Sequence, residues 1–171
     1  MSLAPDQAKI IFDALLPQFK AEYKTTLRVL QAVPADKGEY RPDERSMTAL
    51  DLAWHIASAD IFFMHLASKT PMQGDGTRPA ELANGPAVAA FYAENFPKAL
   101  TLIENITGEQ LVEEIEFHTF KTTALGYLQL NLVHGVHHRG QLSAYLRPMG
   151  AKVPSIYGGS ADEPMSAAAS N

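Results

Sequence analysis

The sequence predicts an all-α protein built as a four-helix bundle, and two observations lead to this fold class. Four long segments place apolar residues at spacings of three and four, which is the pattern of a helix with one buried face. Strand-like alternation is confined to one short region, and segments with glycine and proline separate the helical patterns. Four long helices with little strand are typical of a helix bundle.

The first two helices are expected in the N-terminal half of the chain. The first covers about residues 5–32, and Pro17 should kink or break it. The second is expected to begin after Ser46, a residue type favoured at helix N-caps, and to end before Pro71. Residues 69–86 are rich in glycine and proline, which predicts an exposed connection of the kind that often borders a binding site.

The third and fourth helices are expected at about residues 86–106 and 122–146. The fourth should end where Pro148 and Gly150 supply stop signals. Between these helices, residues 115–120 alternate in a way that predicts a short strand or extended segment.

A chain of 171 residues suits one domain. We expect a helical domain over residues 1–157, followed by a flexible tail over residues 158–171, where small and polar residues dominate.

Composition excludes several classes of function. The net charge of −5 and the lack of a dense basic run argue against nucleic-acid binding. No apolar stretch approaches the roughly 20 residues that span a bilayer, so no membrane association is expected. The chain has no cysteine, which excludes thiolate ligands and cysteine nucleophiles. A cytoplasmic location fits these absences.

Three histidines lie within five positions of the predicted fourth helix. His134 and His138 are four residues apart, so they share a helix face and can both reach one divalent ion, whereas His137 is turned away. The same spacing also arises by chance. Gly135 stands where zinc metalloproteases carry their catalytic Glu, which argues against a protease of that type.

A metal in a bundle core needs ligands from facing helices, and the second helix offers His55 among apolar neighbours. His55 lies about 12 Å from the start of its helix, and the pair lies about 15 Å from the end of the fourth helix. If these helices are antiparallel, the three side chains would therefore lie at the same height along the bundle axis. A core histidine hydrogen-bonded to a carbonyl or a tyrosine hydroxyl is the alternative for His55.

Three imidazoles with open positions would form a site of the catalytic type, suited to Zn²⁺, Ni²⁺, Cu²⁺ or Fe²⁺. Asp51, one turn before His55, is either a carboxylate that orients it or a solvated charge. Arg139 is expected to pair with an acidic residue. Gln141 and Tyr145 either line a pocket or pack between helices. The remaining aromatic and imidazole side chains near these positions are expected in the core (Trp54, Phe62, Phe63) or at the surface (His65, His118, His137).

The stretch HGVHHRGQLSAYLRPMGAKVPSIYG resembles the C-terminal signature of the DinB family, and SMTALDLAWHIASAD resembles its other motif. The resemblance covers about residues 5–157. It implies an up-down-down-up four-helix bundle that binds a divalent metal, usually Zn or Ni, through three histidines. Those positions correspond here to His55, His134 and His138. It also implies a homodimer.

Several members of that family are transferases or isomerases that use low-molecular-weight thiols. The resemblance therefore implies a metal-dependent enzyme that acts on a small-molecule substrate, with such a thiol as a candidate second cofactor. A metal-dependent hydrolase and a non-enzymatic, stress-related metal-binding protein are the alternatives. Neither the residue pattern nor the resemblance identifies catalytic residues beyond the metal ligands or a specific substrate.

Overall fold

A computed structural model of the chain, which describes residues 3–74 and 76–165, confirms the predicted all-α, four-helix bundle. Two further elements connect the third and fourth long helices: a short helix, α4, and a hairpin of two antiparallel strands, β1 and β2. In chain order the elements are α1 (Pro5–Gln31), α2 (Ala49–Ser68), α3 (Gly85–Glu104), α4 (Gly108–Val112), β1 (Glu114–Phe117), β2 (Phe120–Thr123) and α5 (Ala124–Leu146).

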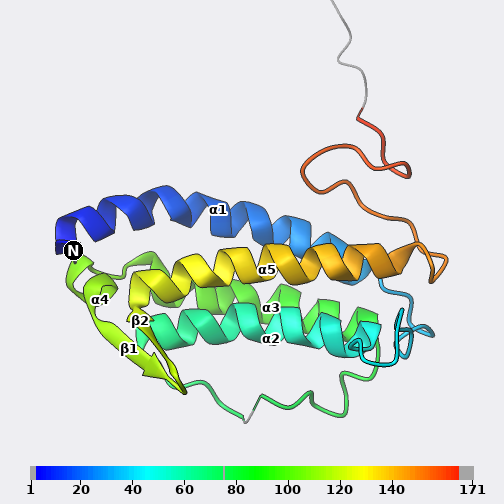
Figure 1. The fold of residues 1–171 in the computed structure, drawn as a ribbon, viewed down its shortest axis with the longest axis horizontal. Helices are drawn as coiled ribbons and strands as arrows, with labels where there is room; N and C mark the ends of the chain where they lie inside the picture. Colours follow the sequence, from blue (N-terminus) through cyan, green and yellow to red (C-terminus); the bar gives the residue numbers. More distant parts are fainter. Residues whose placement is uncertain (1–2, 75, 166–171) are drawn as a thin grey trace, which may run out of the picture.

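The long helices run up, down, down and up (Figure 1). Since α2 and α3 point the same way, residues 69–84 must carry the chain back along the whole bundle, and Figure 1 shows this connection passing beside α2. A 20-residue helix is about 30 Å long, a distance that sixteen extended residues can span. The indole nitrogen of Trp54 on α2 donates to the carbonyl of Gly76 at 3.0 Å, which fastens the connection to the bundle.

Side-chain capping sets where the helices begin. The N-cap of α2 is Thr48, whose hydroxyl accepts from the backbone N–H of Asp51 at 3.1 Å, so the expectation of Ser46 at this position is wrong. Thr123, the last residue of β2, caps α5 in the same way. The hairpin therefore leads directly into the helix that carries His134 and His138.

The expectation was that Pro17 would kink or break the first helix, and α1 continues through this residue without a break. Its side chain is on the solvent-exposed face. The carbonyl four residues earlier, which loses its helical partner, can therefore be hydrated.

The region between α3 and α5 holds more structure than its sequence pattern predicts. The expected extended segment is a hairpin in which Phe117 pairs with Phe120 across a two-residue turn. The helix α4 precedes it, and Thr107 and Gln110 form a capping box at its start. Short elements of this kind have too few residues for a periodic signal.

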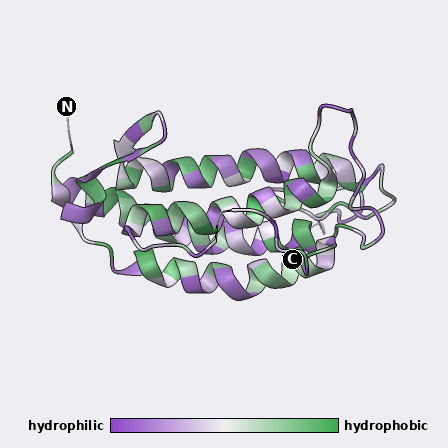
Figure 2. Ribbon diagram, turned by 90° about the horizontal axis from the view of Figure 1, so that it is seen from below, coloured by the Kyte–Doolittle hydropathy of each residue, from purple (hydrophilic) through white to green (hydrophobic). Residues whose placement is uncertain are grey.

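The core lies between the four long helices, and every one of them contributes buried apolar side chains. Figure 2 shows hydrophobic and hydrophilic residues alternating along the helices, as amphipathic helices in a bundle require. None of the helices within the described residues is long and apolar enough to cross a membrane.

Part of the expected tail is described by the structure. Asp162 forms an ion pair with Arg147, and Glu163 forms one with Arg28, so two contacts hold this segment to α1 and to the end of α5. Residues 166–171 of the expected tail lie outside the described residues.

A buried polar cluster joins the helices at mid-height. The Asp60 side chain on α2 accepts from the Tyr92 hydroxyl on α3 at 2.7 Å, and the Asn131 amide on α5 donates to the Asp60 backbone carbonyl at 3.0 Å. Arg139, 1% exposed, contacts Thr26 and forms an ion pair with Glu22, which confirms its expected acidic partner. Burial raises the pKa of the Asp60 carboxyl to about 7, although the Tyr92 hydrogen bond and the Arg139 charge act in the opposite direction.

We expect the raised pKa of Asp60 to make the free energy of unfolding fall between about pH 4 and pH 7. In this range the folded protein keeps a proton that the unfolded chain releases, so each rise in pH favours unfolding. Three pH units at 1.36 kcal/mol each limit the effect to roughly 4 kcal/mol. Urea unfolding across this range should show that Asp60→Asn loses this falling contribution, so that its free energy of unfolding changes more positively with rising pH than that of the wild type, while the exposed control Asp13→Asn should keep the wild-type slope. An unchanged slope in Asp60→Asn would refute the assignment.

Candidate metal centre

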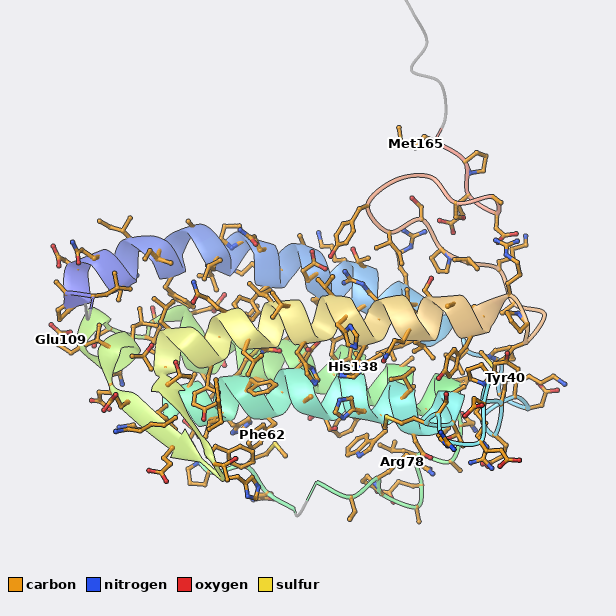
Figure 3. All side chains as sticks on the ribbon, viewed as in Figure 1. Tyr40, Phe62, Arg78, Glu109, His138 and Met165 are labelled. Carbon is orange, nitrogen blue, oxygen red and sulfur yellow. The ribbon has the colours of Figure 1, made fainter. Side chains whose placement is uncertain are left out.

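Three imidazoles from two antiparallel helices meet beside the bundle core. The ring centroids of His55 and His134 lie 4.9 Å apart, and each lies 4.4 Å from the centroid of His138. One ligand atom from each residue lies within 4.8 Å of the others. Figure 3 shows His138 on the side of α5 that faces α2. The structure therefore brings together the three histidines singled out from the sequence.

The arrangement fits a divalent metal ion. The Nε2 atoms of His55 and His134 face each other at 3.1 Å. Two imidazole nitrogens bound to one ion at 2.0–2.1 Å lie about 3.3 Å apart in tetrahedral geometry, so this separation needs only a small adjustment. A hydrogen bond between the two rings also satisfies this distance, provided that one ring donates. The third ring on the same side is what distinguishes a metal centre from a simple histidine pair.

Different contacts orient the individual rings. The Nδ1 atom of His138 lies 2.8 Å from Oε1 of Gln141, one turn further along α5, which leaves its Nε2 for a metal. The ring of His134 packs against Phe63 at a centroid distance of 5.6 Å. Asp51, weighed as a carboxylate that orients His55, instead hydrogen-bonds with Thr48.

Burial keeps two of the rings ready to bind a metal. Burial, together with smaller effects from the charges of the neighbouring imidazoles, lowers the pKa of His134 to about 4. Burial also lowers the pKa of His55, with a smaller effect from the charge of His138. Both rings are therefore neutral near pH 7, the form in which imidazole binds metal ions.

Within the described residues, no further histidine or carboxylate joins this group, and the whole sequence has no cysteine. A metal held by three protein ligands keeps open positions, as catalytic zinc sites do, whereas structural sites are closed by four. These residues would thus leave room on a metal for a substrate or a thiol.

A pocket of about 590 Å³ opens beside the histidines. This volume falls within the range of small-molecule sites. Its lining combines ring nitrogens from the site with an apolar wall and includes His55, Ser58, Phe62, Phe63, Met72, Phe117, His118 and His134. Trp54, expected in the core, is half-buried, and its indole donates to the carbonyl of Gly76, a residue that lines the pocket.

The core expectation fails for Phe62, which is half-buried and lines the pocket; Figure 3 shows it on the hairpin side of α2. Phe63 is half-buried, packs against the core and also lines the pocket. His118 is exposed, as expected, and lines the pocket as well. Its position depends on the hairpin, which the sequence pattern did not predict as a whole.

The other candidate residues from the sequence are not among the three proposed metal ligands. His137 is exposed and its ring lies against that of His138, and His65 lies 3.2 Å from the carbonyl of Thr70. Tyr145 packs edge-on against Tyr40. The sequence pattern was not used to predict a role for Asp60. Its carboxylate lies on an otherwise apolar helix face five residues after His55, and a charge in that position could have indicated a buried polar contact.

Comparison with known proteins gives a consistent result. The model of the DinB family matches residues 6–167. YjoA of Bacillus subtilis (strain 168), described as uncharacterized, is 29% identical over 142 residues, covering 80% of this chain and 89% of that protein. YrdA of the same organism, also described as uncharacterized, is 26% identical over 156 residues, covering 88% and 90%.

Two crystal structures of DinB-like proteins resemble the bundle. That of YjoA from Bacillus subtilis is 26% identical with a TM-score of 0.67, and the match covers 84% of this chain and 97% of that one. That from Bacillus cereus ATCC 10987 has a TM-score of 0.70 at 22% identity, covering 85% and 97%, and so supports the fold alone.

We expect the His134 ring of the metal-free protein to stay neutral down to about pH 4. The lowered pKa means that the stability this neutral ring contributes is present above pH 6.5 and is lost as the pH falls from 6.5 towards 4. Imidazole NMR of labelled protein, with the resonance assigned by its loss in His134→Asn, measures this directly. A midpoint near 6.5 would show that the ring is hydrated rather than buried.

Proposed function

Because this chain belongs to the DinB family and two of its three clustered imidazoles line an open pocket, we propose that it is a divalent-metal-dependent enzyme acting on a small molecule. The proposed ligands are His55, His134 and His138. The observation that carries the proposal is the combination of three ligands, with no fourth among the described residues, and a pocket bounded by two of them.

We propose Zn²⁺ or Ni²⁺ as the metal and a low-molecular-weight thiol as the co-substrate of a transfer reaction. When bound, the ion would act as a Lewis acid that lowers the pKa of a thiol or water molecule. Since the chain has no cysteine, a reactive thiol must come from a separate molecule. His55, His134 and His138 would hold the ion, and the side chains of Phe62 and Phe63 would limit the access of water.

A hydrolase is the second enzymatic candidate. The pocket lining in the described part of the chain contains no carboxylate, so a general base of the kind that zinc hydrolases use has less support. A non-enzymatic metal-binding protein would be expected to use a closed site with four ligands, and the described residues supply three.

The homodimer and the cytoplasmic location stay predictions. Val133 and Val136, both exposed on α5, are apolar side chains of the kind that a second copy would cover.

The metal-free protein, purified without an affinity tag, should take up one equivalent of Zn²⁺ or Ni²⁺ and unfold at a higher temperature as a result. His138→Ala should weaken binding by more than the roughly 10–100-fold that loss of an outer hydrogen bond to a ligand costs. His137→Ala removes a neighbouring exposed imidazole and should bind like the wild type. Elemental analysis and calorimetry provide the measurements. Full metal content in His138→Ala would overturn the ligand assignment.

The metal-loaded protein should accelerate the transfer of at least one low-molecular-weight thiol to a model electrophile. Several thiols should be compared by following thiol consumption, with metal-free protein and His138→Ala as inactive controls. We expect the rate to return when metal is restored to the wild type. If no thiol is consumed by protein that holds its metal, the reaction class is wrong while the metal site stands.

A further inference from the structure

Four aromatic contacts run without a break from the hairpin tip to a proposed metal ligand. His118 lies against Phe117 at a ring-centroid distance of 4.4 Å, and Phe117 lies 4.9 Å from Phe62. Phe62 and Phe63 are 5.6 Å apart, and Phe63 is 5.6 Å from His134. We refer to Phe62, Phe63 and Phe117 as the aromatic wall.

The aromatic wall faces the pocket, and of its three side chains Phe63 also packs against the core. All three side chains line the cavity of about 590 Å³, and Phe117 remains 38% exposed. Aromatic surface left in water is unfavourable, and a flat apolar group placed against it would remove that surface from solvent. Two elements distant in sequence, α2 and β1, supply the wall, so it exists only in the folded protein.

The far end of the pocket is marked by backbone strain. His118 has a φ of +53°, in the left-handed region that a residue with a Cβ seldom adopts. It occupies the first position of the two-residue turn between Phe117 and Phe120, where glycine or asparagine is normally favoured. A residue in an unfavourable backbone conformation that also lines a pocket is a candidate functional residue. Such a conformation costs free energy, and it tends to be kept where function requires it.

We propose that this pocket binds a small molecule that joins a planar aromatic group to an anionic metal-binding group, and that Phe62, Phe117 and His118 select the aromatic end. The anionic end lies at His55 and His134, and the ring lies along the aromatic wall. His118 is a specificity-determining residue at the hairpin tip. This inference rests on the proposed function, since the anionic end requires the metal.

The chemistry of the pocket favours this ligand over a purely polar one. Among its described lining residues, only the imidazoles can carry a charge, and two of those belong to the proposed metal centre. A metal held by His55 and His134 would therefore be the main attraction for an anion. The aromatic wall offers ring faces and edges to the rest of the molecule, and such ring pairs are stabilised beyond the area that they bury.

Two probes with the same metal-binding group separate the two ends of the ligand. Benzohydroxamate and acetohydroxamate differ in carrying a phenyl ring or a methyl group. Their binding to zinc-loaded wild-type protein is measured by calorimetry, with metal-free protein as the blank. We expect benzohydroxamate to bind at least about tenfold more tightly than acetohydroxamate.

Variants of the aromatic wall should remove this preference. Phe62→Ala and Phe117→Ala should each reduce it to less than about threefold, and Phe117→Ala should leave acetohydroxamate binding unchanged. Phe117 is partly exposed, so its variant remains informative if Phe62→Ala folds poorly. The matched control is Phe120→Ala, because Phe120 lies on the same hairpin, is 51% exposed and packs on Tyr127 outside the pocket.

The substitution His118→Gly tests the strained position separately. Glycine adopts a positive φ without strain, so this variant should unfold at a higher temperature than the wild type. It should also bind benzohydroxamate at least about threefold more weakly. A gain in stability with unchanged binding would remove His118 from the proposal.

The outcomes distinguish this inference from the proposed function. Equal affinity for the two probes in the wild type, or equal loss in Phe117→Ala and Phe120→Ala, overturns the aromatic ligand and leaves the metal pocket intact. If neither hydroxamate binds to zinc-loaded protein, the open metal site fails and the inference fails with it.

Discussion

The packing of α2 against α5 at Asp60 is the constraint on which the rest of the structure depends. Asn131 on α5 donates to the backbone of Asp60, and a Cβ at Gly135 would lie only 3.1 Å from the Asp60 carboxylate, so the helices approach closely here. In an antiparallel pair, moving back along α2 to His55 corresponds to moving forward along α5 to His138. The contact at Asp60 therefore sets the level at which the imidazoles meet.

One physical cause acts on both polar groups at this interface, with opposite effects on their pKa values. Burial disfavours charge, so it raises the pKa of the Asp60 carboxyl and lowers that of the His134 imidazole. Both groups are thereby held closer to neutrality. The interior can therefore keep a carboxyl group for helix–helix hydrogen bonding within a few residues of rings that are available to a cation.

The sequence predicted the features that depend on long-range periodicity. Four helices, the shared face of His134 and His138, and the matching depth of His55 all follow from spacing along a helix, and the structure brings the three residues together. The pocket was not predictable in this way. The position of Phe117 depends on a hairpin too short to give a periodic signal, and that of His118 depends on a positive φ that hydrophobic periodicity does not predict.

Because α2 and α3 run parallel, the helices that position the imidazoles and the segment that borders the pocket are different parts of the chain. Helix packing fixes the imidazoles, whereas the connection over residues 69–84 passes outside the core and supplies Met72 to the pocket edge. Insertions or exchanges in such a surface segment cost little folding energy. A bundle of this design can therefore acquire a new ligand preference by altering one crossover segment, while the helices that hold the ion stay the same.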